Sequence, residues 1–96
     1  MAVTARVTVL LHGAYRDFAG ASRAEVDAAT VREALDGAVA AYPSLRERLR
    51  DERGRLREHL NVFANAEDVR RLDGEATALR DGDVVHLIPA ISGGFS

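Results

Sequence analysis

The chain has 96 residues, a formal net charge of −2 at pH 7 and an apolar fraction of 47%, values typical of one folded domain. It contains no cysteine, which excludes disulfides, thiolate zinc sites, a cysteine nucleophile and a sulfur relay through its own thiol. It also lacks an apolar run near the ~20 residues of a membrane span and a signal-peptide pattern, so we expect a cytoplasmic protein without a membrane partner.

The first part of the chain predicts a β-hairpin. Apolar and polar residues alternate over about residues 3–12, the pattern of a half-buried strand. The next segment, HGAYRDFAGAS, contains two glycines and is predicted to be a loop whose Tyr15 and Phe18 fold back onto the core. RAEVDA, residues 23–28, alternates again and is predicted to pair with the first strand.

The main helix is predicted to begin after Thr30, an N-cap residue followed three positions later by Glu33 in a capping-box pattern. Apolar residues then recur at helical spacing and mark the stripe that we expect to face the core: Val31, Ala34, Leu35, Ala38, Val39 and Tyr42. Pro43 should end this helix, because the residue before a proline avoids the α region.

A cluster of arginines follows. All 13 basic residues of the chain are arginine, and six of them lie in RERLRDERGRLR, residues 46–57, where one more helical turn is predicted before Gly54. Such a cluster can indicate nucleic-acid binding. Acidic residues interleave with it, however, and a phosphate backbone requires a surplus of positive charge. We therefore expect a solvated face of mixed charge and no nucleic-acid partner.

The second half returns to strand patterns. In LNVFANAEDV, Val62 and Ala64 share one face and Phe63 lies on the other. NAED is predicted to be a turn and VRRL a short strand or sheet edge. After the turn sequences DG and DGD, VVHLI is predicted to be the last strand, with Pro89 ending its pairing.

This order of elements predicts an α+β protein with the β-grasp (ubiquitin-like) fold, a mixed sheet of four to five strands packed on one main helix. Residues 1–88 are expected to form the domain, and residues 89–96 a flexible C-terminal tail with a Gly-Gly pair.

No catalytic or metal-binding motif stands out. The three histidines, His12, His59 and His86, are too far apart in sequence for a local ligand motif, and RDGD is more often a turn than a metal site, so we expect no metal. No serine, cysteine or acid is placed by motif to work with His86. This favours a surface histidine over a general base, and a chain that is not itself an enzyme.

Residues 60–94, LNVFANAEDVRRLDGEATALRDGDVVHLIPAISGG, resemble the C-terminal half of the MoaD/ThiS family of ubiquitin-like sulfur carriers. The matching pieces, in order, are N-x-E-D-V-R, L-D-G, T-x-L, D-G-D-x-V and a Pro-Ala-aliphatic-small-Gly-Gly end. The first half is also similar to the MoaD side of the family, so the resemblance covers nearly the whole chain.

The resemblance implies a protein co-substrate with no bound cofactor. An E1-like enzyme would use ATP to adenylate Gly94, and a sulfur donor would then convert the adenylate to a thiocarboxylate. A sulfur-accepting synthase would use this sulfur for molybdopterin, cysteine or a thio-metabolite. Gly93 lacks a Cβ and would give access to a narrow channel, where Ile91 would be a further anchor.

Docking onto these partners requires a surface near the tail. On the last strand His86 and Ile88 share one face, and the alternate residues share the other. If those alternate residues fill the core, Ile88 and Phe63 form an apolar docking patch beside His86. The open alternative is that the loop at residues 66–80 covers one or both of them.

The chain departs from most carriers because Phe95 and Ser96 follow the second glycine. While they remain, Gly94 has no free carboxylate and cannot be adenylated. Some family members with such extensions are trimmed by a JAMM-type metalloprotease, and this tail resembles such a case. The open alternative is a permanently inactive relative. The alternative function is a ubiquitin-like binding module or protein modifier without sulfur transfer. Without lysine, the chain could not form isopeptide-linked polymers of itself except through its α-amino group.

Overall fold

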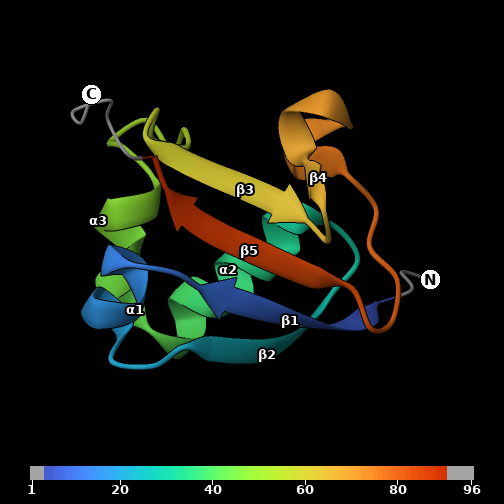
Figure 1. Cartoon of the computed structure of the whole chain (residues 1–96), viewed down its shortest axis with the longest axis horizontal. Coiled ribbons are helices and arrows are strands. Elements are labelled where there is room, and N and C mark those ends of the chain that lie inside the picture. The colour runs from blue at the N-terminus through green and yellow to red at the C-terminus, as the bar shows by residue number, and fades with distance from the viewer. Residues whose placement is uncertain (1–3, 91–96) are drawn as a thin grey trace.

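Five strands form one mixed sheet in the computed structural model, which describes residues 4–90 (Figure 1). The strands are β1 (Ala5–Leu11), β2 (Arg23–Ala28), β3 (Leu60–Ala64), β4 (Glu67–Asp68) and β5 (Val84–Pro89). The α-helices are α1 (Ala14–Ala19), α2 (Val31–Ala41) and α3 (Arg46–Leu49). The described residues also contain three 3-10 turns: η1 (Pro43–Leu45), η2 (Val69–Arg71) and η3 (Gly74–Ala76). Within the described residues, no helix is long and apolar enough to cross a membrane.

The order of the strands in the sheet is β2-β1-β5-β3-β4. The first hairpin, β1–β2, is antiparallel, as predicted. The last strand inserts in the middle, parallel to β1 and antiparallel to β3. One main helix, α2, crosses one face of the sheet. These features confirm the predicted β-grasp fold.

The core lies between the sheet and α2. Val9 of β1 and Val85 and Leu87 of β5 have no exposed surface, since alternate strand residues point toward the helix. Four residues of the predicted α2 stripe are fully buried: Val31, Ala34, Leu35 and Ala38. Val39 and Tyr42 are only half-buried and pack at the margin of the core. The helical spacing therefore identified the buried face correctly, except at its C-terminal end.

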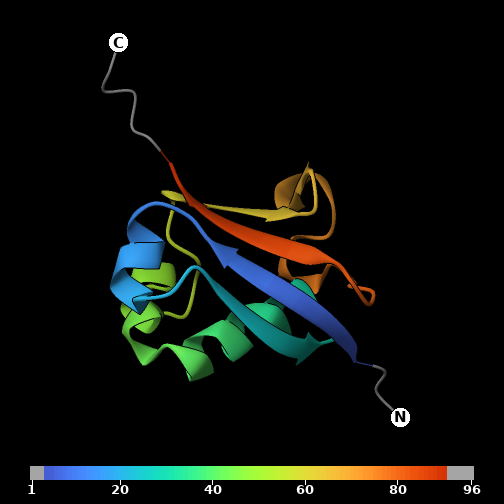
Figure 2. The ribbon, with the colours of Figure 1, turned by 60° about the horizontal axis from the view of Figure 1, so that its bottom comes forward.

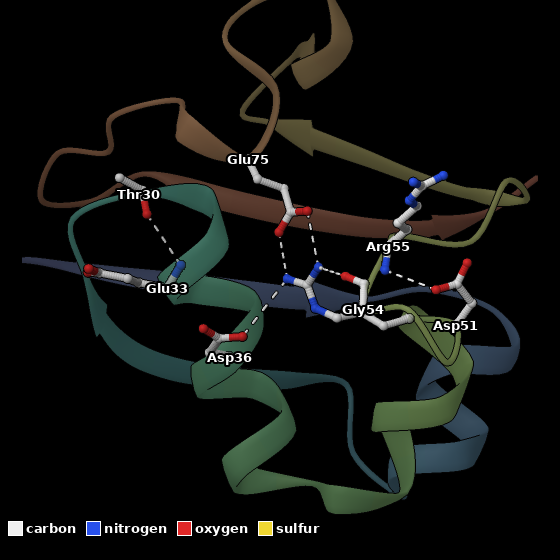
Figure 3. A network of polar contacts seen from close by, with 8 residues as sticks. Thr30, Glu33, Asp36, Asp51, Gly54, Arg55 and Glu75 are labelled. Carbon is white, nitrogen blue, oxygen red and sulfur yellow. Dashed lines mark hydrogen bonds and ion pairs between the residues drawn. The ribbon is translucent and has the colours of Figure 1, made fainter.

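The start of α2 is held by the predicted capping residues. The Thr30 hydroxyl accepts a hydrogen bond from the Glu33 backbone N–H at 3.3 Å (Figure 3). The Glu33 carboxylate accepts one from the backbone N–H of Ala29 at 2.7 Å, one residue earlier than in a standard capping box. At the other end α2 stops at Ala41, and Pro43 begins η1.

Two segments have a different secondary structure from the predicted one. HGAYRDFAGAS contains the short helix α1 rather than only a loop; Tyr15 is buried, but Phe18 stays exposed. VRRL is not a strand, because the Asp68 carboxylate accepts a hydrogen bond from the backbone N–H of Arg70 and starts the 3-10 turn η2. The fourth strand is thus only Glu67–Asp68.

Pro89 does not end the pairing of β5. It stands opposite Leu60, and the N–H of Ala90 donates to the carbonyl of His59 at 2.7 Å. Successive N–H groups of a strand point to opposite sides, so the N–H that Pro89 lacks would have pointed away from β3. On that side β1 has already ended at Leu11. Pairing therefore extends beyond the predicted end.

The arginine cluster is not wholly solvated. The Arg50 side chain is 16% exposed and makes a bidentate ion pair with Glu75 (Figure 3). It also donates to the Gly54 carbonyl and pairs with Asp36. The ion pair with Glu75 raises the pKa of Arg50 further, mainly through its side-chain hydrogen bond. This arginine ties the segment before β3 to η3 and α2, which the prediction of a solvated face missed.

Gly37 sets how closely α2 approaches the sheet. A Cβ at this position would lie 2.8 Å from Cγ1 of Val26 on β2. Alanine usually stabilises a helix relative to glycine by about 1 kcal/mol. We predict the opposite here: Gly37→Ala should lower the free energy of unfolding by about 1–2 kcal/mol net, because the added methyl overpacks the interface. Urea unfolding measures this.

The control is Ala40→Gly on the exposed side of the same helix, which should cost about 1 kcal/mol through propensity alone. A stabilised Gly37→Ala protein would contradict the close approach of α2 to β2.

Candidate functional site

The base of the C-terminal tail is held from two sides. The ring of Pro89 packs on Gly13, where a Cβ would come within 2.9 Å of the proline Cγ and where the backbone φ is +57°. On the other side, the Ala90 N–H is bonded to the His59 carbonyl. The chain therefore leaves the sheet at a defined point, at the end where α1 lies (Figure 2). The predicted tail residues Ile91, Gly93, Gly94, Phe95 and Ser96 lie outside the described residues.

The face of the sheet opposite α2 carries the predicted docking residues, and Figure 1 looks onto it. His86 stands opposite Phe63 of β3 and, on its other side, level with Leu10 of β1. Ile88 stands opposite Asn61. All five side chains are half-buried. The structure thus brings Phe63, His86 and Ile88 onto one face of adjacent strands, as the alternation predicts.

Phe63 and Ile88 are neither fully exposed nor fully covered by the loop at residues 66–80. They are neither core residues nor among the exposed large apolar side chains. Phe63 borders a shallow hollow of about 270 Å³ that it shares with Ala66, Glu67, Asp68 and Arg71, so the segment after β3 flanks it. Each residue retains some accessible surface on the open face.

His86 has a partner that no sequence motif indicated. Its Nδ1 lies 3.0 Å from Nε2 of His12, which follows the end of β1, and the ring centroids are 5.2 Å apart. Burial lowers the pKa of His86, and the nearby His12 lowers it further. A hydrogen bond between the two nitrogens needs one of them without a proton, so the two rings cannot both be charged while it persists.

The described domain brings the predicted docking residues onto one face and fixes the position of Ala90, from which the tail continues. No group of three or more histidine, cysteine or acidic side chains that could hold a metal occurs within residues 4–90. The contact between His12 and His86 could not be predicted from the sequence, because 74 residues separate them. Only the parallel pairing of β1 with β5 brings the two histidines together.

Known proteins share this architecture. The sequence profile of the ThiS family matches residues 9–94. Small archaeal modifier protein 3 of Haloferax volcanii is 44% identical over 68 residues, which cover 71% of this chain and 73% of that protein. The sulfur carrier protein CysO of Mycobacterium tuberculosis is 46% identical over 57 residues, or 57% of this chain and 61% of that protein. The crystal structure of SAMP1 from Haloferax volcanii superposes with a TM-score of 0.84 and 34% identity, covering 93% of this chain and 99% of the other.

The histidine pair generates a prediction for pH dependence. Because the pKa of His86 in the folded state lies below its ordinary value of 6.5, the unfolded state binds this proton first as the pH falls. The contribution of His86 to stability is therefore complete above pH 6.5 and is lost as the pH falls through the folded pKa. Histidine NMR signals followed against pH should show His86 titrating below 6.5.

In His12→Asn, the pKa of His86 should rise, although not fully, because the charge of His12 is removed while the burial of His86 remains. An unchanged titration of His86 in this variant would rule out the electrostatic coupling of the two rings.

Proposed function

The chain belongs to the ThiS family of small ubiquitin-like sulfur carriers and modifiers, as the resemblance of its second half predicted, and we propose that it is a sulfur carrier acting through Gly94. Members of this family are typically co-substrates rather than catalysts. The observation that carries the proposal is that the Gly-Gly pair is separated by only three residues from β5, whose end is fixed by the hydrogen bond from Ala90 to His59.

The reaction begins with a carboxylate at Gly94. An E1-like adenylating enzyme transfers AMP from ATP to this carboxylate and releases pyrophosphate. Sulfide supplied by a sulfur donor then attacks the acyl carbon, AMP leaves, and a glycyl thiocarboxylate remains. Its ionised sulfur is the nucleophile that a sulfur-accepting synthase uses, and the synthase determines whether the product is molybdopterin, cysteine or a thio-metabolite.

The domain and the tail have separate roles in this chemistry. Gly94 is four residues beyond Ala90, so the reacting carbon can lie at most about 14 Å from the backbone of Ala90. Glycine at positions 93 and 94 fits a narrow channel because it has no side chain, and Ile91 is an anchor at its entrance. The open face with Phe63, His86 and Ile88 is the docking surface.

Gly94 becomes available only after cleavage of the bond that follows it. In this sequence Phe95 and Ser96 occupy the next positions, so the carbonyl of Gly94 belongs to a peptide bond. A JAMM-type metalloprotease is the partner that we propose for their removal, with hydrolysis leaving the Gly94 carboxylate.

Protein modification is a second candidate function. It is favoured by the 44% identity to small archaeal modifier protein 3. Here a lysine amine of a target protein would attack the same adenylated Gly94, and AMP would leave, giving an isopeptide bond in place of the thiocarboxylate. The chain has no lysine of its own, so this modification would not extend into lysine-linked chains.

Intact-mass measurement tests the carrier function. The 96-residue protein and a form ending at Gly94 are each incubated with ATP, an E1-like adenylating enzyme and sulfide. We expect only the form ending at Gly94 to gain the mass of one sulfur in place of one oxygen. A gain on neither form, with an enzyme that activates a related carrier in parallel, would exclude sulfur transfer.

Docking through the open face predicts a second result. Phe63→Ala and Ile88→Ala should each weaken binding of the Gly94-ended form to the adenylating enzyme by about tenfold, because each removes apolar contact area near the tail. Isothermal titration calorimetry measures the affinity. Leu72→Ala is the control, since Leu72 is 44% exposed and does not lie on a sheet strand. Equal losses in all three variants would contradict a docking role for this face.

A further inference from the structure

A second surface borders the tail, on the side of α1 and α3 rather than on the open sheet face. It is an open groove of about 450 Å³. Its apolar wall is formed by Tyr15 and Phe18 of α1 and by Pro89 at the end of β5. Phe18 is 40% exposed, and only Leu72 is a more exposed large apolar side chain among the described residues.

Two arginines form the rim of this groove, and both are held in place. The guanidinium of Arg48 stacks 4.0 Å above the centre of the Phe18 ring. The Nε of Arg57 donates to the backbone carbonyl of Glu47 at 2.6 Å. Within residues 4–90 neither arginine pairs with a carboxylate, unlike Arg50 of the same cluster. Glu47 is the single acidic residue of the lining, so positive charge predominates.

The groove lies within reach of any partner that binds the tail. Pro89 is part of its wall, and Gly94 lies at most about 14 Å beyond Ala90. An active site that holds Gly94 therefore lies within about 14 Å of Ala90, close enough for the surrounding protein surface to contact the groove.

We propose that the groove receives a segment of the E1-like adenylating enzyme that carries carboxylates beside an apolar side chain. This inference rests on the proposed function, because adenylation of Gly94 is the step that every later use of the tail requires. The carboxylates pair with Arg48 and Arg57, whose guanidinium groups are already positioned. The apolar side chain covers Phe18 and Pro89. The groove thus selects the activating enzyme by charge, and the open sheet face supplies a separate apolar contact.

Charge reversal tests the rim. The assay measures the pyrophosphate that the adenylating enzyme releases as it activates the form ending at Gly94. In this form, Arg48→Glu/Arg57→Glu should raise the KM of the enzyme for the carrier by about tenfold or more. The kcat should not change, because neither arginine touches the reacting atoms. Added salt should raise the KM of the unmodified carrier more than that of the double variant, since the lost contacts are ionic. Phe18→Ala tests the apolar wall in the same assay and should also raise KM.

The matched control is Arg53→Glu/Arg80→Glu, which changes net charge by the same amount at two exposed arginines outside the groove lining. Its KM should stay within about twofold of the unmodified carrier. Amide NMR spectra establish that each variant is folded, and signals of Phe18 and Arg48 should shift when the enzyme is added to the unmodified carrier.

The outcomes separate the two proposals. If the unmodified Gly94-ended form gives no pyrophosphate with an enzyme that activates a related carrier, the sulfur-carrier function fails and the groove proposal fails with it. If pyrophosphate forms but the groove and control variants have equal KM values, or the groove signals do not shift, only the groove proposal is overturned.

Discussion

The parallel pairing of β1 with β5 is the constraint on which the rest of the structure depends. It joins the two ends of the domain in the centre of the sheet, with Leu11 level with Leu87. Two further features follow from it: the buried strand residues face α2, and His12 meets His86. The pairing also fixes where the chain leaves the sheet, because Pro89 comes to rest on Gly13 just after β1. The pairing of β1 with β5 therefore determines both the fold and the geometry of the candidate site.

Local patterns predicted most of the fold. Alternation identified β1, β2, β3 and β5, because each has one buried face and one face toward solvent. The capping residues and Pro43 bounded α2, since both act on their immediate neighbours. One error arose where a side chain acts on the backbone against the pattern: the Asp68 carboxylate turns an apparent strand into η2. The helix α1 is only six residues long and has no capping side chain to reveal it.

The site was predictable to the extent that it depends on strand alternation. The alternation of strand residues predicts that one face carries Phe63, His86 and Ile88. The importance of the Gly-Gly end was inferred from the family resemblance. The histidine pair and the groove do not, because each depends on segments far apart in the chain. Arg48, for example, meets Phe18 across 30 positions, and the sequence shows only that Arg48 belongs to a mixed-charge run. Such contacts arise from tertiary packing, which local sequence patterns do not predict.

The hydrogen bond from Ala90 to His59 also has a mechanical consequence. Tension applied to the tail by an enzyme that grips it is directed along β5. Because β5 is bonded to β1 on one side and to β3 on the other, the load falls on two ladders in shear, and the strand cannot be peeled from one edge. A pull on the chain beyond Ala90 would therefore have to shear both ladders before it could unravel the domain.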